Sequence, residues 1–265
     1  MLTIIREHKG FWPQIWKLAR LELKKRFKGS LLGSAWAILT PVLMLLMFWF
    51  AFTIGLRVRS DIDGVSFFLF LMAGLVPWFF IRDMINKGSK SIRSNKQYVT
   101  KINFPVSTIC TFSGLSYFMV HLLLLGSMII YLAVAGYAPT VYNLQIFFYA
   151  PLMFLFFLAL SWSTATWSVF SKDLQNLISS LMTAVFWLSG ILWNSYTLEI
   201  EWLRKLMLFN PVTYIVNGYR KTFLYNEWFW ENPLETGVFL GMLLLVVAFG
   251  AYNYTRLRKD MADVL

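Results

Sequence analysis

Long stretches without a charged residue are the feature that most constrains this chain. Five such runs cover residues 29–56, 64–81, 102–171, 174–198 and 236–255. A helix that crosses the hydrocarbon core of a bilayer needs about 20 apolar residues, and a Lys or Arg at its centre is costly. Hydrophobic residues fill 58% of the 265 positions and charged residues 14%, whereas soluble domains average about 45–50% and 25%. We therefore expect a membrane to be the main solvent of this chain.

The longest run is too long for one helix, and it breaks at Gly136–Pro139, where Gly and Pro favour a turn. We predict an all-α membrane protein with six transmembrane helices. They lie near 35–56, 64–82, 107–134, 144–170, 174–195 and 236–255. The predicted organisation is an N-terminal arm (1–34), a six-span domain (35–255) and a tail (256–265).

Six spans would put both termini on one side of the membrane, and the Lys and Arg residues indicate which side. The segments on the side of the termini hold 18 of the 24 basic residues, and the opposite segments hold six. Because basic loops stay in the cytoplasm, both termini are predicted to be cytoplasmic. This topology also explains the formal net charge of +11, so we expect no nucleic acid partner.

The N-terminal arm contains a predicted amphipathic helix. Its apolar stripe is Trp12, Trp16, Ala19, Leu23 and Phe27. The basic residues Lys17, Arg20, Lys24 and Lys28 fall on another stripe. Such a helix lies in the plane of the membrane interface. Two roles fit this pattern, a simple anchor on anionic lipid and the handling of a substrate.

The segment 196–235, on the predicted outer side, is more than a loop. Its uncharged stretch 206–219 is too short to cross a membrane and is interrupted at Asn210-Pro211. We predict a pair of re-entrant or interfacial helices here. The aromatic residues 228–230 are typical of a belt at the lipid headgroups.

Motifs for catalysis are missing from the sequence. It contains no GxxxxGK[ST], HExxH, CxxC or GxSxG pattern, and its only cysteine is Cys110. With two histidines, no zinc cluster is expected. His121 is the one His, Asp, Glu, Lys or Arg inside the charge-free runs, and we interpret it as a helix contact, with a proton relay as the alternative. These features favour a pore or half-pore powered from elsewhere, with no catalytic site, cofactor or metal of its own.

A family resemblance rests on stretches that occur in order along nearly the whole chain. They are LLGSAWAILTPVLMLLMFWF (31–50), DGVSFFLFLMAGLVPWFF (63–80), NKQYVTKINFPVS (95–107), SKDLQNLISSL (171–181), NPVTYIVNGYRKTFL (210–224) and ADVL (262–265). Together with the interface helix, they resemble the permease subunit of type-2 ABC exporters, in the branch that exports lipid-linked polysaccharides. The strings GLVPWFFI and KINFPVS are most similar to wall teichoic acid permeases of Gram-positive bacteria.

The resemblance implies a homodimer in a bacterial plasma membrane, in contact with membrane lipids and with two copies of a separate ABC ATPase that binds ATP and Mg. The implied substrate is a polymer on polyprenyl pyrophosphate, moved from the cytoplasmic to the outer side, with wall teichoic acid as the first expectation. O-antigen or capsular polysaccharide is the alternative. A smaller hydrophobic compound, a structural scaffold and a membrane-embedded transferase also remain open, the last with Asp61 and Asp63 as its only close acidic pair.

The family lines its path with the first and fifth spans, which here carry many aromatic residues. The candidate path residues are Trp36, Phe48, Trp49, Phe52, Phe186, Trp187 and Trp193. Each of them could instead pack between helices or face lipid. Lys and Arg form charge-assisted bonds with phosphate. The candidate residues for the lipid pyrophosphate are therefore Arg20, Lys24, Lys25, Arg26 and Lys28.

The stretch 86–101 matches the coupling helix that the family seats on its ATPase, and Lys172-Asp173 matches a shorter second contact. The predicted ATPase-coupling residues are Ser94, Asn95, Lys96, Gln97, Tyr98, Lys101, Lys172 and Asp173. A generic basic cytoplasmic loop is the alternative explanation for this stretch.

Overall fold

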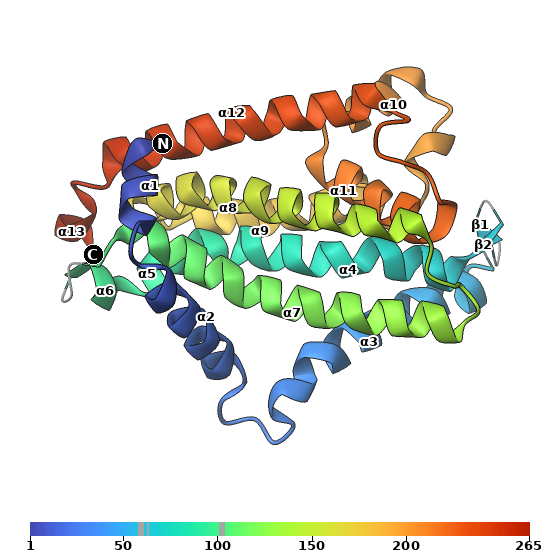
Figure 1. Cartoon of the computed structure of the whole chain (residues 1–265), viewed down its shortest axis with the longest axis horizontal. Helices are drawn as coiled ribbons and strands as arrows, with labels where there is room; N and C mark the ends of the chain where they lie inside the picture. Colours follow the sequence, from blue (N-terminus) through green and yellow to red (C-terminus); the bar gives the residue numbers. More distant parts are fainter. Residues whose placement is uncertain (58–60, 63, 101–103) are drawn as a thin grey trace.

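The computed structural model describes residues 1–57, 61–62, 64–100 and 104–265. Within these residues, five helical stretches are long and apolar enough to cross a membrane, which supports a mostly helical membrane protein. Four of them contain α4 (Phe67–Asn86), α7 (Val106–Val134), α8 (Ile146–Phe170) and α12 (Pro233–Leu257). The first contains α3 (Trp36–Trp49) and its π-helical extension Phe50–Gly55. Figure 1 shows one bundle with both chain ends at the same end, which we call the terminal end.

Two predicted spans differ from the structure. The predicted fifth span is represented by α9 (Asp173–Leu188), whose 16 residues reach only about 24 Å. Gly190, with φ of 64°, turns the chain shortly after it. The predicted count of six spans is therefore not confirmed. The second span begins at Phe67 because two short antiparallel strands, β1 (Asp61–Ile62) and β2 (Val65–Ser66), precede it.

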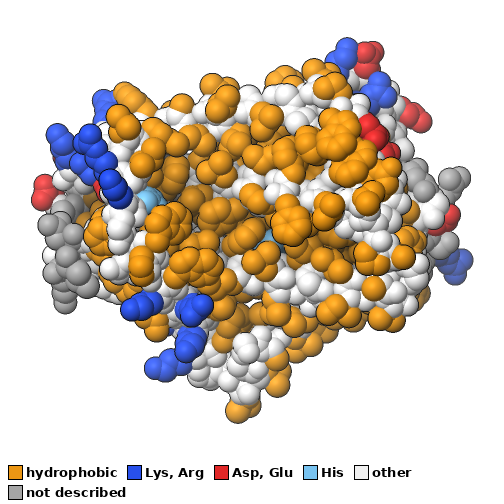
Figure 2. Space-filling model, in the orientation of Figure 1, with side chains coloured by type: hydrophobic (Ala, Val, Ile, Leu, Met, Phe, Trp, Pro, Cys, Tyr) orange, Lys and Arg blue, Asp and Glu red, His pale blue; other side chains and the backbone are white. Residues whose placement is uncertain are grey.

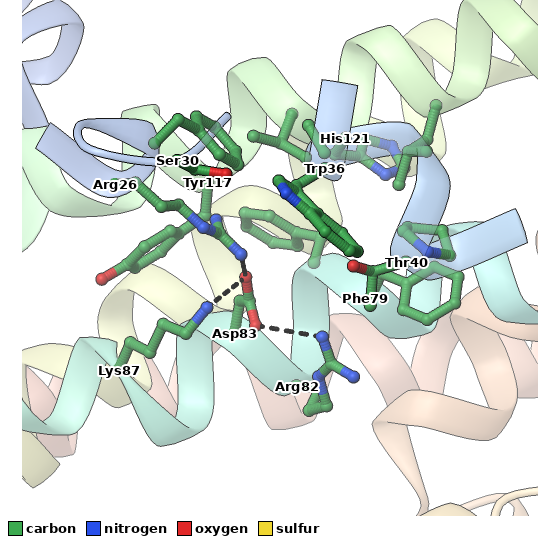
Figure 3. Close-up of a pocket in the computed structure, with 16 residues that line it drawn as sticks. Arg26, Ser30, Trp36, Thr40, Phe79, Arg82, Asp83, Lys87, Tyr117 and His121 are labelled. Atoms are coloured by element: carbon green, nitrogen blue, oxygen red, sulfur yellow. Dashed lines mark hydrogen bonds and ion pairs between the residues drawn. The ribbon is translucent and has the colours of Figure 1, made fainter. Parts of the chain in front are cut away.

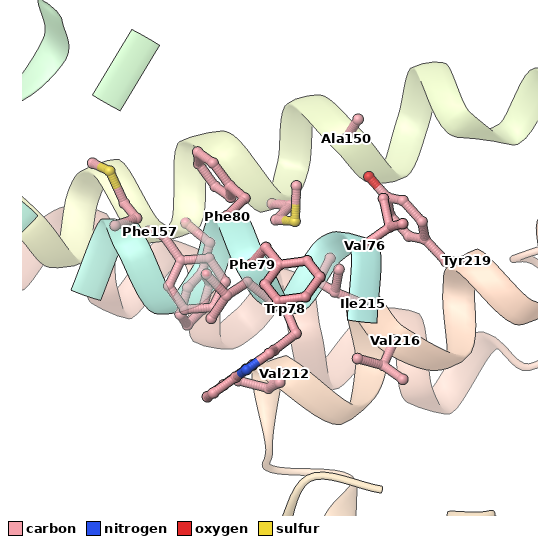
Figure 4. Packing of buried hydrophobic residues seen from close by; sticks show 14 of the residues in the cluster. Val76, Trp78, Phe79, Phe80, Ala150, Phe157, Val212, Ile215, Val216 and Tyr219 are labelled. Atoms are coloured by element: carbon pink, nitrogen blue, oxygen red, sulfur yellow. The ribbon is translucent and has the colours of Figure 1, made fainter. Parts of the chain in front are cut away.

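Helix α4 is the centre of the bundle. In its most apolar stretch 83% of the residues are buried. It packs against α7, α8, α9 and α11 (Pro211–Arg220). Figure 4 shows the side chains of Trp78, Phe79 and Phe80 spread in different directions among residues of the neighbouring helices.

The outer segment forms short helices on both sides of the predicted break. Helix α10 (Glu201–Met207) precedes it, α11 follows it, and the π-helical turn Lys221–Tyr225 extends α11. The Asn210 side chain caps α11 by accepting from the amides of Val212 and Thr213, at 3.0 and 3.3 Å. Nine of the ten residues of α11 are buried, and Pro211 is partly buried. The break at Asn210-Pro211 is thus present, whereas the re-entrant placement stays a prediction.

The outer segment also contains a buried cation. Arg220 donates to the carbonyls of Gly190 and Ile191, at 2.8 and 2.7 Å, and its guanidinium lies 3.5 Å from the centroid of the Phe70 ring. The sequence count treated Arg220 as a loop charge. The structure places it inside the bundle, where it joins α11, α4 and the end of α9.

The N-terminal arm forms α1 (Leu2–His8) and α2 (Trp12–Phe27). Ile15 and Ala19 of α2 are fully buried against Ile109 and Phe112 of α7. Trp12 and Trp16 remain about half exposed beside that contact. The face of α2 that packs on α7 is therefore rotated relative to the predicted apolar stripe. The side chains of Trp12 and Trp16 stay partly exposed outside this contact.

The terminal end gathers the remaining short helices. They are a 3-10 turn at Gly88–Lys90, α5 (Ser91–Ser94), α6 (Lys96–Thr100) and α13 (Met261–Val264). Glu7 of α1 accepts from Tyr254 of α12 and pairs with Arg258, so the two ends of the chain are joined. Further 3-10 turns lie at Gly33–Ala35, Val141–Gln145 and Ser195–Thr197. Figure 2 shows an apolar middle on one face, with charged side chains at both ends of the bundle. Lys and Arg side chains gather at the terminal end and near α2, and others lie beside Asp and Glu side chains at the opposite end.

Candidate substrate site

A cavity of about 320 Å³ lies where α2, α3, α4 and α7 meet. The end of α2 provides Arg26, the start of α3 provides Trp36, and the last turns of α4 provide Asp83 and Lys87. Tyr117 and His121 of α7 complete the wall (Figure 3). We call this space the head cavity. Its lining combines a charged wall, formed by Arg26, Arg82, Asp83 and Lys87, with aromatic and apolar side chains.

The charged wall is built around one carboxylate. The side chain of Asp83 is 8% exposed and pairs with Arg26, with Lys87 at 2.9 Å and with Arg82 at 3.4 Å. Burial of a carboxylate is unfavourable unless it is paired, so Asp83 needs these cations. Three positive charges against one negative charge leave the wall with a surplus of two. The three cations keep between 28% and 46% of their surface exposed, so they remain accessible to a ligand.

Aromatic rings hold the same cations in place. The guanidinium of Arg26 lies 5.8 Å from the centroid of the Tyr117 ring, and that of Arg82 lies 5.4 Å from the Phe79 ring. The Nζ atom of Lys87 lies 5.9 Å from Tyr117. Cations fixed by a carboxylate and by rings form a preorganised anion site, because Arg and Lys donors match phosphate oxygens. The head cavity is therefore suited to a phosphate group attached to an apolar body.

The predicted pyrophosphate residues are divided between two surfaces. Arg26 lines the head cavity. Lys24, Lys25 and Lys28 line a shallower cleft between α2 and the 3-10 turn that precedes α3, and Arg20 is exposed on α2. The sequence interpretation missed Arg82, Asp83 and Lys87. The sequence did contain one signal for this site. Asp83 and Lys87 stand four residues apart just after an apolar run, and a helix brings two such side chains together.

The predicted path aromatics mostly make ring contacts within the bundle. Phe48 of α3 meets Phe186 of α9 with ring centroids 5.3 Å apart, so the helices of the first and fifth predicted spans do touch. Trp49 packs on Phe68, Phe52 on Phe67, and Phe186 also on Trp78. Trp187 is 49% exposed, and its carbonyl accepts from the Trp193 indole at 2.9 Å. Trp36 lines the head cavity. Their role in a path stays a prediction.

The predicted coupling residues lie at the terminal end. Ser94, Lys96 and Gln97 are exposed, whereas Asn95 is buried and donates to the Ser91 carbonyl at 3.1 Å. Tyr98 packs against Phe104 and Phe112. Lys172 and Asp173 stand at the start of α9. Lys101 lies outside the described residues, as does Asp63, the partner of Asp61 in the transferase alternative.

His121 makes the contacts expected of a structural histidine. Its Nε2 lies 2.8 Å from the Tyr219 hydroxyl and its Nδ1 lies 3.4 Å from the Val76 carbonyl, so one ring joins α7, α11 and α4. Among the described residues no group of three or more His, Cys, Asp or Glu could hold a metal ion.

Comparison with known proteins gives consistent matches over the length of the chain. The family model described as "ABC-2 type transporter" matches residues 13–224. The O-antigen export system permease protein RfbA of Myxococcus xanthus is 28% identical over 97% of both chains. The protein of the same name from Klebsiella pneumoniae is 25% identical over 92% of both chains. The polysialic acid transport protein KpsM of Escherichia coli is 24% identical, over 90% of this chain and 91% of that one.

Proposed function

The chain belongs to the ABC-2 type transporter family, and we propose that it is the permease subunit of an exporter that moves a lipid-linked polysaccharide across the plasma membrane. The head cavity is the observation that carries this proposal. It offers three cations beside an apolar wall, at the depth where the last turns of α4 leave the bundle core. A pyrophosphate joined to a hydrocarbon chain has the matching chemistry.

For the polymer, we propose O-antigen or capsular polysaccharide. Each of the relatives reported above is named for its substrate. Two are O-antigen export permeases and one is a polysialic acid transport protein, and all three match nearly the full chain. This favours the alternative expectation from the sequence over wall teichoic acid, for which these relatives provide no support. The teichoic precursor is therefore kept as a competing substrate in the test below.

The complex requires an energy source that this chain lacks. We propose that two copies of the permease bind two copies of a separate ABC ATPase, which would hold ATP and Mg. The exposed residues of α5 and α6, together with Lys172 and Asp173, are the proposed contact. The termini would then be cytoplasmic, because they share the terminal end with these helices.

The experiment is reconstitution of the permease with candidate ABC ATPases in proteoliposomes, with vanadate-sensitive ATP hydrolysis as the readout. Lipid-linked O-antigen and lipid-linked teichoic precursor are supplied in parallel. We expect stimulation by the O-antigen substrate. Stimulation by the teichoic precursor alone would move the substrate to that polymer, and failure to bind any ATPase would refute the exporter.

The role of the head cavity is tested with Arg26→Gln and Lys87→Gln. A charge-assisted bond contributes about 1.5–3 kcal/mol, so each variant should need about 10- to 100-fold more lipid-linked substrate for half-maximal stimulation. The matched control is Lys17→Gln, an exposed residue of the same helix α2. Equal behaviour of Lys17→Gln and the two cavity variants would contradict a phosphate site in the head cavity.

A further inference from the structure

A second cavity adjoins the head cavity on its apolar side. It has a volume of about 260 Å³ and lies between α3, α4 and α7. Its walls are almost entirely apolar and include Val42 and Leu46 of α3, Met72 and Val76 of α4, and Met128 of α7. We call it the tail groove.

The two cavities share part of their walls. Pro41 of α3, Phe79 of α4 and Leu124 of α7 line both of them. One residue from each of the three helices therefore stands at the junction. A ligand in the head cavity would therefore lie next to the tail groove.

The two cavities also follow one direction along the helices. On α4 the lining runs from Lys87 and Asp83 in the head cavity to Phe68 at the far end of the tail groove. On α7 it runs from Tyr117 to Tyr131. At 1.5 Å per residue, the path on α7 is about 21 Å long, and the path on α4 is about 23 Å long from Asp83 and about 28 Å long from Lys87. The combined site is thus an elongated slot parallel to the spans, cationic at the end nearer the terminal end and apolar along the rest.

This separation of charge from apolar surface identifies the occupant. We infer that the combined site holds one lipid molecule whose phosphate or pyrophosphate sits among Arg26, Arg82 and Lys87. The part of its hydrocarbon chain nearest the phosphate lies in the tail groove. A free anion would leave the apolar groove unused, and an apolar molecule would leave the surplus charge unpaired. This inference rests on the proposed function for the identity of the lipid, the polyprenyl carrier of the polymer.

Helix α3 is well placed to admit such a chain. Only 6% of its most apolar stretch is buried, and Val42 and Leu46, which line the groove, are 40% and 43% exposed. The groove is therefore open along α3. A chain could enter it sideways from the bilayer while the headgroup stays at the interface, so the charged group need not cross hydrocarbon.

The test is photo-crosslinking in vesicles of neutral phospholipid with polyprenyl monophosphate that carries a diazirine in the isoprene units nearest the phosphate. We expect labelled peptides from the groove segments of α3, α4 and α7. Val42→Trp and Ser127→Trp, which fill the groove from two helices, should reduce this labelling at least fivefold. Leu43→Trp and Ile130→Trp, exposed on the same helices and absent from the groove lining, are the matched controls.

The outcomes separate this inference from the proposed function. If Arg26→Gln and Lys87→Gln impair stimulation by the lipid-linked substrate but the diazirine labels none of the groove segments, the tail groove is wrong and the exporter stands. If an excess of an ordinary anionic phospholipid, phosphatidylglycerol, abolishes the labelling as well as unlabelled polyprenyl phosphate does, the groove is a general lipid site and the inference also fails. Loss of labelling in both control variants would likewise overturn it.

Discussion

Helices α3 and α4 are both long apolar spans, yet they have opposite positions in the fold. In the most apolar stretch of α4 83% of the residues are buried, and in that of α3 only 6%, although α3 is the more apolar of the two. Hydropathy therefore does not decide which span forms the centre. In a bilayer, the lipid tails are as apolar as the protein core. Close packing and polar contacts therefore determine which helix lies at the centre of the bundle.

The contacts of α4 illustrate this difference. Its Gly74 lets Arg220 and the Ile191 carbonyl approach closely, and its Asp83 attracts cations from α2 and from its own last turns. Helix α3 has no Asp, Glu, Lys or Arg, and only Ala37 and Leu45 are buried in it. The exposed side of α3 is left for lipid or for a second protein.

The largest expected effect follows from core packing. Trp78→Ala in α4 removes a side chain that is 2% exposed and packs on Phe186, and we expect a loss of about 3–5 kcal/mol in the free energy of unfolding. Met47→Ala in α3, where Met47 is 63% exposed, should change it by less than about 0.5 kcal/mol. Equilibrium unfolding in mixed micelles measures both values. Similar losses would remove the contrast between the two helices.

A smaller effect is expected from close approach at a glycine. A Cβ atom at Gly74 would lie 2.8 Å from Nη2 of Arg220 and 3.0 Å from the Ile191 carbonyl oxygen. Gly74→Ala should therefore destabilise the fold by about 1–3 kcal/mol. Gly126→Ala in α7 is the control, because nothing lies within 4 Å of its added Cβ. The same unfolding experiment applies, and a stable Gly74→Ala variant would show that α11 can shift away from α4.

The charged end of α4 should contribute less to stability than its core. Asp83→Asn removes the carboxylate shared by Arg26, Arg82 and Lys87, which then repel one another. Because these cations are partly exposed, we expect a loss of about 1–2 kcal/mol. We also expect faster trypsin cleavage near Arg26 as α2 loosens. Glu201→Gln, which breaks an exposed pair with Lys205, should leave both measurements unchanged.

The smallest effect on stability is expected on the exposed side of α3, which includes Met47 and which we call the free face of α3. It is also the sharpest test of the comparison between α3 and α4. If a second copy covers this face, Met47→Cys should form cross-links between two chains in the membrane with little change in stability. Met72 in α4 is only 7% exposed, so Met72→Cys should form no cross-links between chains. Gels run without reductant measure the product. Absence of cross-linking from position 47 and from Leu43→Cys would assign the free face of α3 to lipid.

The aromatic residues show how far the sequence could lead toward the site. Aromatic enrichment in the first and fifth predicted spans was plain, and Phe48 and Phe186 do meet. Which ring faces a neighbour and which faces outward was not predictable, because helices that are apolar on all sides give no preferred face. The rotated face of α2 was also not predictable, because Ile15 competes with Trp16 for the inward position.

Most of the architecture was determined by the sequence itself. The apolar spans, the interface helix and the break at Asn210-Pro211 depend on the local sum of hydropathy and on caps and prolines, which act within a few residues. Only the tertiary structure decided which charges are buried and where the cavities lie. Arg26 and Asp83 are 57 residues apart, and Arg220 bonds to carbonyls 29 and 30 residues away. Such pairs form because buried charges need partners, and no local pattern specifies which distant partner each one finds.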